Sequence, residues 1–338
     1  MKKLSPIDKL LYIINSLIAT LLLLSYLLPY VSPTTIPVFA ILSLFVPILL
    51  LINIAFVIYW LIKLKKQLLL SSFILLIGWF TITPFYKISK KNTSLNSDLK
   101  IMSYNVRMFN HWKWLDEENI ENKISSFIKE NDPDILTVQE NMSNTKYMLD
   151  FPYKYIQKKY ARGRFGMAIY SKLPIVKTGS LKLENTSNNI IFADIVRNQD
   201  TIRVYNLHLQ SLNISPDKEN FGQENSEKLI QRLKAGFKQQ AEQTEIFLAH
   251  EKSWEGKKIV CGDFNNTAYS WVYNQISKNK KDAFIEAGKG FGKTFKYPFP
   301  MRIDFIFTDD KAVINQFNSY SVKYSDHYPI LARVNWTK

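Results

Sequence analysis

Polar side chains of the kinds that bind metal ions and activate water recur at or beside predicted strand ends in the second part of this sequence. They fall in six short segments: Tyr104-Asn105, Gln139-Glu140, Asn206-Leu207-His208, Gly262-Asp263-Phe264-Asn265, Arg302-Ile303-Asp304 and Ser325-Asp326-His327. In an α/β fold, such strand ends gather around one crevice. A single asparagine or aspartate at a strand end is usually a turn or capping residue, so the inference depends on the whole set.

Together these residue types make up what a metal-assisted phosphoester hydrolase needs. Carboxylate oxygens hold a hard cation such as Mg²⁺, which polarises the phosphoryl group and neutralises the leaving oxygen. An aspartate close to a water molecule can orient or deprotonate it, and an asparagine can donate to a phosphate oxygen that gains charge. A histidine held by a buried aspartate stays protonated, because the carboxylate favours the imidazolium form.

Short runs rich in β-branched and aromatic residues alternate with amphipathic helical patterns, which indicates an α/β domain. The predicted strands are residues 99–104, 135–138, 167–170, 190–196, 202–209, 258–260 and 303–308, and the predicted helices are residues 116–130 and 226–250. The segment Tyr297-Pro298-Phe299-Pro300 comes just before Arg302-Ile303-Asp304 and predicts a rigid aromatic loop beside the site. The sequence assigns no ligand to that loop.

Seven segments, taken in order, resemble the endonuclease/exonuclease/phosphatase superfamily. They are MSYNV, TVQE, MAIYSKLPI, YNLHL, VCGDFN, RIDFIF and SDHYPI, and the resemblance spans residues 101–336. It implies an α/β fold of the deoxyribonuclease I type, a four-layer α/β sandwich with two central sheets and helices outside.

The resemblance also implies a metal site. Glu140 is expected to be the main metal ligand, with Asn105 and Asp326 beside the ion or its waters. The expected cofactor is Mg²⁺, with Mn²⁺ as the other candidate.

The remaining family positions are expected to act on water and phosphate. Asp263 would orient and activate the attacking water, and Asn265 would bind the phosphate. His327 would contact the scissile phosphate, oriented by Asp304, and His208 would be a second histidine on the phosphate side.

Two departures from one branch of the superfamily narrow the expected substrate. Abasic-site endonucleases carry an acidic residue where this chain has Arg107, and a tyrosine where it has His208. A histidine at that position is more similar to the deoxyribonuclease I, sphingomyelinase and inositol-phosphatase branches. Abasic-site DNA repair is therefore not expected.

The first part of the sequence has the character of a membrane protein. No charged residue or histidine occurs in residues 10–62, and a second uncharged stretch covers residues 67–86. Because about 20 apolar residues cross a bilayer and prolines 29, 33 and 37 interrupt the first stretch, we expect three transmembrane helices near residues 10–28, 38–62 and 68–86. The expected organisation is a membrane anchor over residues 1–90, a linker over 91–98 and a catalytic domain over 99–338.

Lysines occur in the segments that would lie on one side of the membrane. Lysines 2, 3 and 9 precede the first stretch and lysines 63, 65 and 66 follow the second, whereas the proline-rich turn carries no charge. Positive charge in short loops marks the cytoplasmic side. Three crossings from a cytoplasmic N-terminus would place the catalytic domain on the extracytoplasmic side.

Composition excludes disordered, collagen-like and small disulfide-bonded proteins, since 46% of the residues are hydrophobic and there is one cysteine. Residues 1–90 hold eight lysines and one acidic residue, so the other 36 basic and 28 acidic residues give residues 91–338 a net charge of +8. That charge suits a phosphate-bearing substrate or a nearby anionic membrane.

The sequence thus predicts a membrane-anchored, metal-dependent phosphoesterase that hydrolyses a phosphodiester or phosphomonoester by in-line attack of water. Its substrate stays open between nucleic acid and a phospholipid headgroup or other small phosphoester such as an inositol phosphate. The alternative outside enzymes is a membrane-tethered binding module of the same fold without turnover. The intact set of metal and water-activating residues disfavours that alternative.

Overall fold

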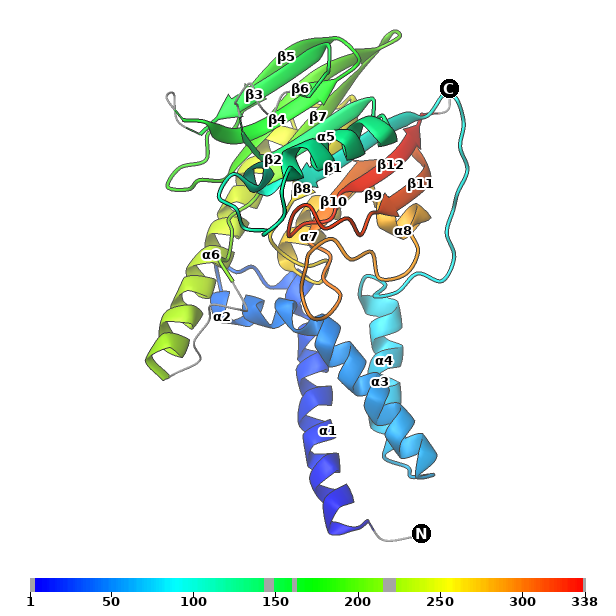
Figure 1. Ribbon diagram of the computed structural model, residues 1–338. Helices are drawn as coiled ribbons and strands as arrows, with labels where there is room; N and C mark the ends of the chain where they lie inside the picture. Colours follow the sequence, from blue (N-terminus) through cyan, green and yellow to red (C-terminus); the bar gives the residue numbers. More distant parts are fainter. Residues whose placement is uncertain (1–3, 143–148, 160–162, 215–222, 337–338) are drawn as a thin grey trace.

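The computed structural model describes residues 4–142, 149–159, 163–214 and 223–336 (Figure 1). The strands are β1 Leu99–Asn105, β2 Ile135–Met142, β3 Tyr153–Lys158, β4 Phe165–Ser171, β5 Ile175–Ser180, β6 Asn189–Arg197, β7 Asp200–His208, β8 Lys257–Asp263, β9 Lys280–Asp282, β10 Asp304–Asp309, β11 Val313–Ser319 and β12 Ile330–Asn335. The α-helices are α1 Pro6–Ser25, α2 Pro37–Ala40, α3 Val46–Ile62, α4 Leu68–Thr81, α5 Ile120–Asn131, α6 Gln223–Glu251, α7 Trp271–Ser277 and α8 Ala283–Ala287. Three short 3₁₀ segments are η1 Leu28–Tyr30, η2 Ile41–Leu44 and η3 Arg107–Asn110.

Two six-stranded sheets form the centre of the domain, in the orders β11-β12-β1-β2-β4-β3 and β5-β6-β7-β8-β10-β9. Aliphatic side chains from both sheets, such as Ile101, Ile135, Val204 and Ile259, are fully buried in one shared cluster. The sheets therefore pack face to face, and burial of this apolar surface is the main stabilising contribution to the domain.

Helices cover the two outer faces. Ile124 and Ile128 of α5 pack on the outer side of the first sheet, against residues such as Leu136 of β2. Phe247 of α6 and Val272 of α7 pack on the outer side of the second sheet. The predicted α/β fold with two sheets and helices outside is confirmed.

Strand direction explains why the polar segments meet. β1 runs parallel to β2, which places Asn105 opposite Gln139, and β7 runs parallel to β8, which places His208 opposite Asp263. β10 runs antiparallel to β8, so its first residue, Asp304, also lies opposite Asp263. The carboxyl ends of parallel strands and the start of an antiparallel strand thus reach the same edge.

All seven predicted strands occur, as β1, β2, β4, β6, β7, β8 and β10, and the predicted helix 226–250 is α6. The helix predicted from residue 116 begins only at Ile120, because Asn119 before it adopts a left-handed conformation with φ of 58°. Strands β3, β5, β9, β11 and β12 were not predicted. Four of them, β3, β5, β9 and β11, lie at sheet edges, where the burial that shapes a strand sequence is weaker.

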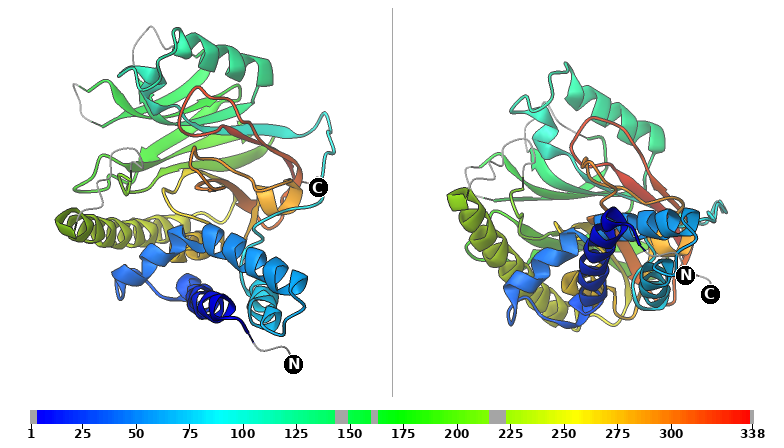
Figure 2. Two further views of the ribbon diagram at one scale, coloured as in Figure 1. Left: turned by 60° about the horizontal axis from the view of Figure 1, so that its bottom comes forward. Right: turned by 90° about the horizontal axis from the view of Figure 1, so that it is seen from below.

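Helices α1, α3 and α4 extend together from one side of the domain, with the N-terminus near the far end of α1 (Figures 1 and 2). Their inward-facing polar residues bond to one another. The Asn15 amide donates to Ser71, the Ser71 hydroxyl donates to Asn53, and the Trp60 indole donates to Asn15. The amides therefore join helices, as expected for polar residues in an apolar bundle.

The expectation of three full-length transmembrane helices is wrong. Among the residues that the structure describes, one continuous helical stretch, Pro6–Tyr30, can cross a membrane by length and composition, and Pro37–Leu44 with Val46–Ile62 counts as a second only if its 56° bend lies within one span. The third stretch, residues 68–86, is helical over the 14 residues of α4, about 21 Å at 1.5 Å per residue. That is shorter than the roughly 30 Å of hydrocarbon.

The N-terminal helices dock on the segment that follows the Gly262-Asp263-Phe264-Asn265 motif. Asn274 donates to the Pro29 carbonyl at 2.8 Å, and Thr267 donates to the Ser43 carbonyl at 2.9 Å. The Ser43 hydroxyl lies 3.3 Å from the Asn266 side-chain oxygen. The helices and turns of residues 6–81, called the N-terminal unit below, are therefore in direct contact with residues 266–274.

Candidate active site

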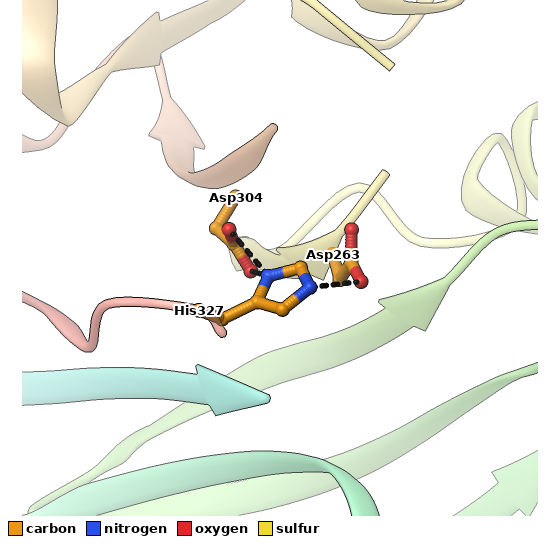
Figure 3. A group of neighbouring side chains, drawn as sticks. All are labelled: Asp263, Asp304 and His327. Carbon is orange, nitrogen blue, oxygen red and sulfur yellow. Dashed lines mark hydrogen bonds and ion pairs between the residues drawn. The ribbon is translucent and has the colours of Figure 1, made fainter. Parts of the chain in front are cut away.

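His327 lies between two buried carboxylates (Figure 3). Its Nδ1 is 3.0 Å from Asp304 Oδ2, and its Nε2 is 3.6 Å from Asp263 Oδ2. Asp263 ends β8, Asp304 begins β10, and His327 comes from the loop before β12. All three side chains are at most 7% exposed.

These contacts shift the pKa values of both His327 and Asp263. Burial alone would lower the pKa of His327, but the charges of Asp304 and Asp263 outweigh it and raise the pKa well above its ordinary value. Burial raises the pKa of Asp263 to about 6, although His327 and His208 favour its charged form. At neutral pH the site therefore holds an imidazolium beside an ionised carboxylate that is able to accept a proton.

Gly262 allows this arrangement. It has φ of +136°, and a Cβ placed there would lie 1.9 Å from the Leu207 carbonyl oxygen of the neighbouring strand. β7 and β8 can therefore approach closely at their ends only because residue 262 has no side chain. That approach brings His208 Nε2 to 3.7 Å from Asp263 Oδ2.

Asn105 connects Asp263 to Glu140. Its Nδ2 lies 3.0 Å from Asp263 and 3.4 Å from Glu140, while its Oδ1 accepts from the backbone N–H of Arg107. Because the amide donor faces the carboxylates, Asn105 in this structure braces Asp263 and Glu140.

Glu140 stands at an irregularity of β2, where the register with β4 shifts between Val138 and Asn141. Its φ is 52°, a left-handed conformation that glutamate rarely adopts and that turns its side chain out of the strand alternation. Burial and the charge of Asp326 raise the pKa of Glu140. Backbone strain at a residue aimed into a site is typical of functional positions.

The Glu140 region fits a hard divalent cation. Two carboxylates, Glu140 and Asp326, repel one another there, and the Arg107 guanidinium lies 3.0 Å from Asp326. Carboxylate oxygens at a site with excess negative charge are the donors that Mg²⁺ and Mn²⁺ prefer.

A second group of possible metal-ligand atoms belongs to Asp263, Asp304 and His327, and these atoms lie within 4.8 Å of one another. We call these three residues the relay. Both ring nitrogens of His327 face carboxylates, and its raised pKa keeps both protonated. An imidazolium has no lone pair to give a metal. The relay therefore suits proton handling better than coordination.

Asn265 adopts φ of 49° directly after the motif aspartate. Its backbone N–H donates to Asp263 at 2.7 Å, and its side-chain amide donates to the Leu209 carbonyl at 2.9 Å. Burial lowers the pKa of His208, so this imidazole is neutral at pH 7. Asn265 therefore steadies the loop around Asp263, and it also lines the cavity.

The eight residues expected from the sequence come together in space. Asn105, Glu140, His208, Asp263, Asp304 and His327 are joined by the contacts above, and Asp326 and Asn265 line one cavity with Glu140, Asp263 and His327. That cavity has a volume of about 550 Å³.

Sequence reasoning missed other residues of this cavity. Arg107, noted only as a departure, supplies a positive charge at the Glu140 end and stacks over the Trp114 ring at 4.7 Å. Leu44 and Phe45 reach the same cavity from the N-terminal unit. The 56° bend between Leu44 and Val46, next to Pro47 at the start of α3, places them there.

Residues 102–327 match the endonuclease/exonuclease/phosphatase family. The chain belongs to that family. Residues 8–85 match a domain of unknown function (DUF8431), and no curated protein is detectably similar to the chain.

Solved structures of family members share the fold. The endonuclease/exonuclease/phosphatase from Bacteroides vulgatus is 19% identical, with a TM-score of 0.55 over 72% of this chain and 100% of that one. A humanized D. rerio TDP2 is 16% identical, with a TM-score of 0.54 over 71% of this chain and all of its own. The human Nocturnin catalytic domain with bound sulfate anion is 16% identical, with a TM-score of 0.52 over 72% and 97%.

Proposed function

We propose that this protein is a membrane-anchored, divalent-metal-dependent phosphoesterase that uses an activated water as nucleophile. The observation that carries the proposal is the contact of His327 with both Asp304 and Asp263, which Asn105 links to Glu140. Family membership supports hydrolysis of phosphoesters at a coarse level. The intact and connected set of polar residues disfavours a binding module without turnover.

In the proposed reaction, Asp263 accepts a proton from a water molecule whose oxygen forms a new bond to phosphorus. The bond from phosphorus to the leaving oxygen breaks, and solvent returns a proton to that oxygen. The His327 imidazolium, held by Asp304, donates to a phosphate oxygen that gains charge, and neutral His208 donates beside it.

The metal is expected at the other side of the phosphate. Glu140 and Asp326 would hold Mg²⁺ or Mn²⁺, with Asn105 fixing Glu140 in place. When bound, the cation supplies positive charge to the phosphoryl group and to the leaving oxygen. Arg107 partly balances these carboxylates from the side of Asp326.

Membrane attachment is supported by exposed apolar surface on the helices. Ile7, Leu17, Phe73, Trp79 and Phe80 are each more than 60% exposed. Exposed apolar surface of this extent needs an apolar environment or a partner. We infer that α1 crosses a bilayer, with the N-terminus cytoplasmic and the domain at the extracytoplasmic surface, and that the shorter helices α3 and α4 lie beside it, with Lys63 after α3 paired to Asp8 of α1.

Hydrolysis of bis(4-nitrophenyl) phosphate and 4-nitrophenyl phosphate by the full chain tests the activity. We expect release of nitrophenol in Mg²⁺ or Mn²⁺, its loss in EDTA, and a higher half-saturating Mg²⁺ concentration in Glu140→Ala. Equal rates with EDTA and with Mg²⁺ would contradict metal dependence. The two substrates also distinguish diesterase from monoesterase activity.

A further inference from the structure

The active-site cavity has a polar end and an apolar end. Glu140, Asp263, Asp326 and His327 line the polar end, together with Arg107. More than half of the lining residues are aliphatic or aromatic, and none of those takes part in the proposed reaction. The cavity is therefore larger and more apolar than a phosphate group requires.

A row of aromatic rings leads away from the catalytic histidine. The Phe295 ring packs on His327 at 4.9 Å between centroids and stacks with Tyr297 at 6.3 Å, and Tyr297 contacts Phe299 at 4.8 Å. These side chains belong to the loop before β10, for which the sequence assigned no ligand. The apolar wall thus begins at the reacting end.

The facing walls come from α6 and from the N-terminal unit. Leu229 and Leu233 of α6 line the cavity, as do Leu44 and Phe45 at the bend between η2 and α3. Leu44 and Leu233 share a buried cluster with Met301 and Ile303, which fixes the wall in place. The segment proposed to lie at the bilayer surface is thus part of the active-site wall.

The charge of the lining does not match a nucleic-acid backbone. Among the described lining residues Arg107 is the one lysine or arginine, and it is already paired with Asp326. Binding along a polynucleotide uses successive lysine and arginine contacts to phosphates. The cavity instead offers one place for a phosphate and a long apolar surface.

The cavity also lies next to the surface from which a lipid would come. Phe45, which lines the cavity, is 49% exposed, and Ile36 and Val38 earlier in the same segment are about half exposed. All three lie on the segment between α1 and α3, so exposed apolar side chains occur on both the helices and the cavity lining. A hydrocarbon chain could pass along this surface without crossing water.

We propose that the substrate is a lipid phosphoester, with its phosphate between Glu140 and His327 and its hydrocarbon chain along Phe295, Tyr297, Leu229 and Phe45. This inference rests on the proposed phosphoesterase function and names the substrate class of that site. Hydrolysis adds water across a phosphorus–oxygen bond, so the products are an alcohol and a phosphate, and the chain stays on whichever part carried it.

The test uses the full chain in lipid nanodiscs with Mg²⁺ and three soluble diesters: methyl, butyl and octyl 4-nitrophenyl phosphate, each kept below its micelle concentration. Burial of a methylene raises kcat/KM by up to about fourfold, so we expect the octyl ester to exceed the methyl ester by at least about tenfold.

A matched pair of double variants separates the cavity from the bilayer. Phe45→Ser with Leu229→Ser removes apolar wall from the N-terminal unit and from α6, and we expect it to bring the octyl-to-methyl ratio of kcat/KM down to within about twofold of one. Phe73→Ser with Ile246→Ser changes exposed apolar residues of the same two units outside the cavity lining, and should leave the dependence intact.

Each of the remaining outcomes would overturn either the lipid assignment or the proposed phosphoesterase function. Equal kcat/KM for the three esters, a dependence that survives in the Phe45/Leu229 variant, or faster cleavage of plasmid DNA than of the octyl ester overturns the lipid assignment but leaves the phosphoesterase proposal standing. Failure to hydrolyse any of these substrates, including DNA, overturns the proposed function itself.

Discussion

At the scale of single residues, the proposed chemistry depends on His327 having a carboxylate on each side of its ring. Asp304 contacts Nδ1 and Asp263 faces Nε2, so two negative charges oppose the effect of burial. The same contacts leave Asp263 as the less basic partner, ionised above a pKa of about 6. One buried group thus carries a proton while its neighbour is ready to accept one.

Asp304→Asn tests this charge balance. Activity that needs protonated His327 is lost as pH rises through the pKa of that histidine, which in the native protein lies well above its ordinary value. Without the Asp304 charge, burial lowers that pKa, so we expect the alkaline limb of kcat/KM to move to lower pH by on the order of one unit or more.

The measurement is kcat/KM from pH 5 to 10 at saturating Mg²⁺. Asp310→Asn, an exposed aspartate just past the far end of β10, is the matched control and should keep the native profile. An alkaline limb that stays in place in Asp304→Asn would show that His327 does not act as an imidazolium.

At the scale of elements, strand direction and close approach bring the site together. Asn105, His208 and Asp263 are predictable because each ends a strongly β-type run. The contribution of Leu44 and Phe45 was not predictable, since an uncharged proline-containing run does not reveal where a helix bends. Arg107 was hidden for a related reason: residues 107–110 all have positive φ, between 43° and 58°, which no sequence pattern here indicates.

Gly262→Ala tests the approach of β7 and β8. The added Cβ meets the Leu207 carbonyl oxygen in a backbone conformation that alanine disfavours, so we expect a loss of stability of roughly 2 kcal/mol or more and a lower activity. The readout is the thermal midpoint of unfolding of the full chain in nanodiscs.

Gly290→Ala is the comparison for this variant. Gly290 also has positive φ, +73°, but a Cβ there meets nothing within 4 Å. It should therefore show the cost of the backbone conformation without the clash. Equal midpoints for the two variants would mean that strand approach does not limit residue 262.

At the scale of the whole molecule, the helical unit and the domain act as one assembly. In the segment after Asp263, Thr267 donates to the Ser43 carbonyl and Asn274 donates to the Pro29 carbonyl of the N-terminal unit. The exposed apolar side chains of that unit lie away from this contact. The domain is therefore expected to sit against the bilayer with a fixed orientation, and the charge of the lysine-rich loop predicts which side that is.

Cysteine labelling tests that orientation. The native Cys261 is fully buried, so it should give little background. In spheroplasts of a bacterial host, we expect a membrane-impermeant maleimide to label Asp310→Cys and to label Lys66→Cys only after lysis. Labelling of Lys66→Cys before lysis, with Asp310→Cys protected, would reverse the proposed topology.

The most direct test of the central claim is the Mg²⁺-dependent hydrolysis of octyl 4-nitrophenyl phosphate by the native chain, Asp263→Asn and Asp310→Asn at pH 7.5. If Asp263 activates the water, its amide replacement lowers kcat by about a hundredfold or more with the fold retained, while Asp310→Asn keeps the native rate. A rate for folded Asp263→Asn within about twofold of the native chain would contradict the account.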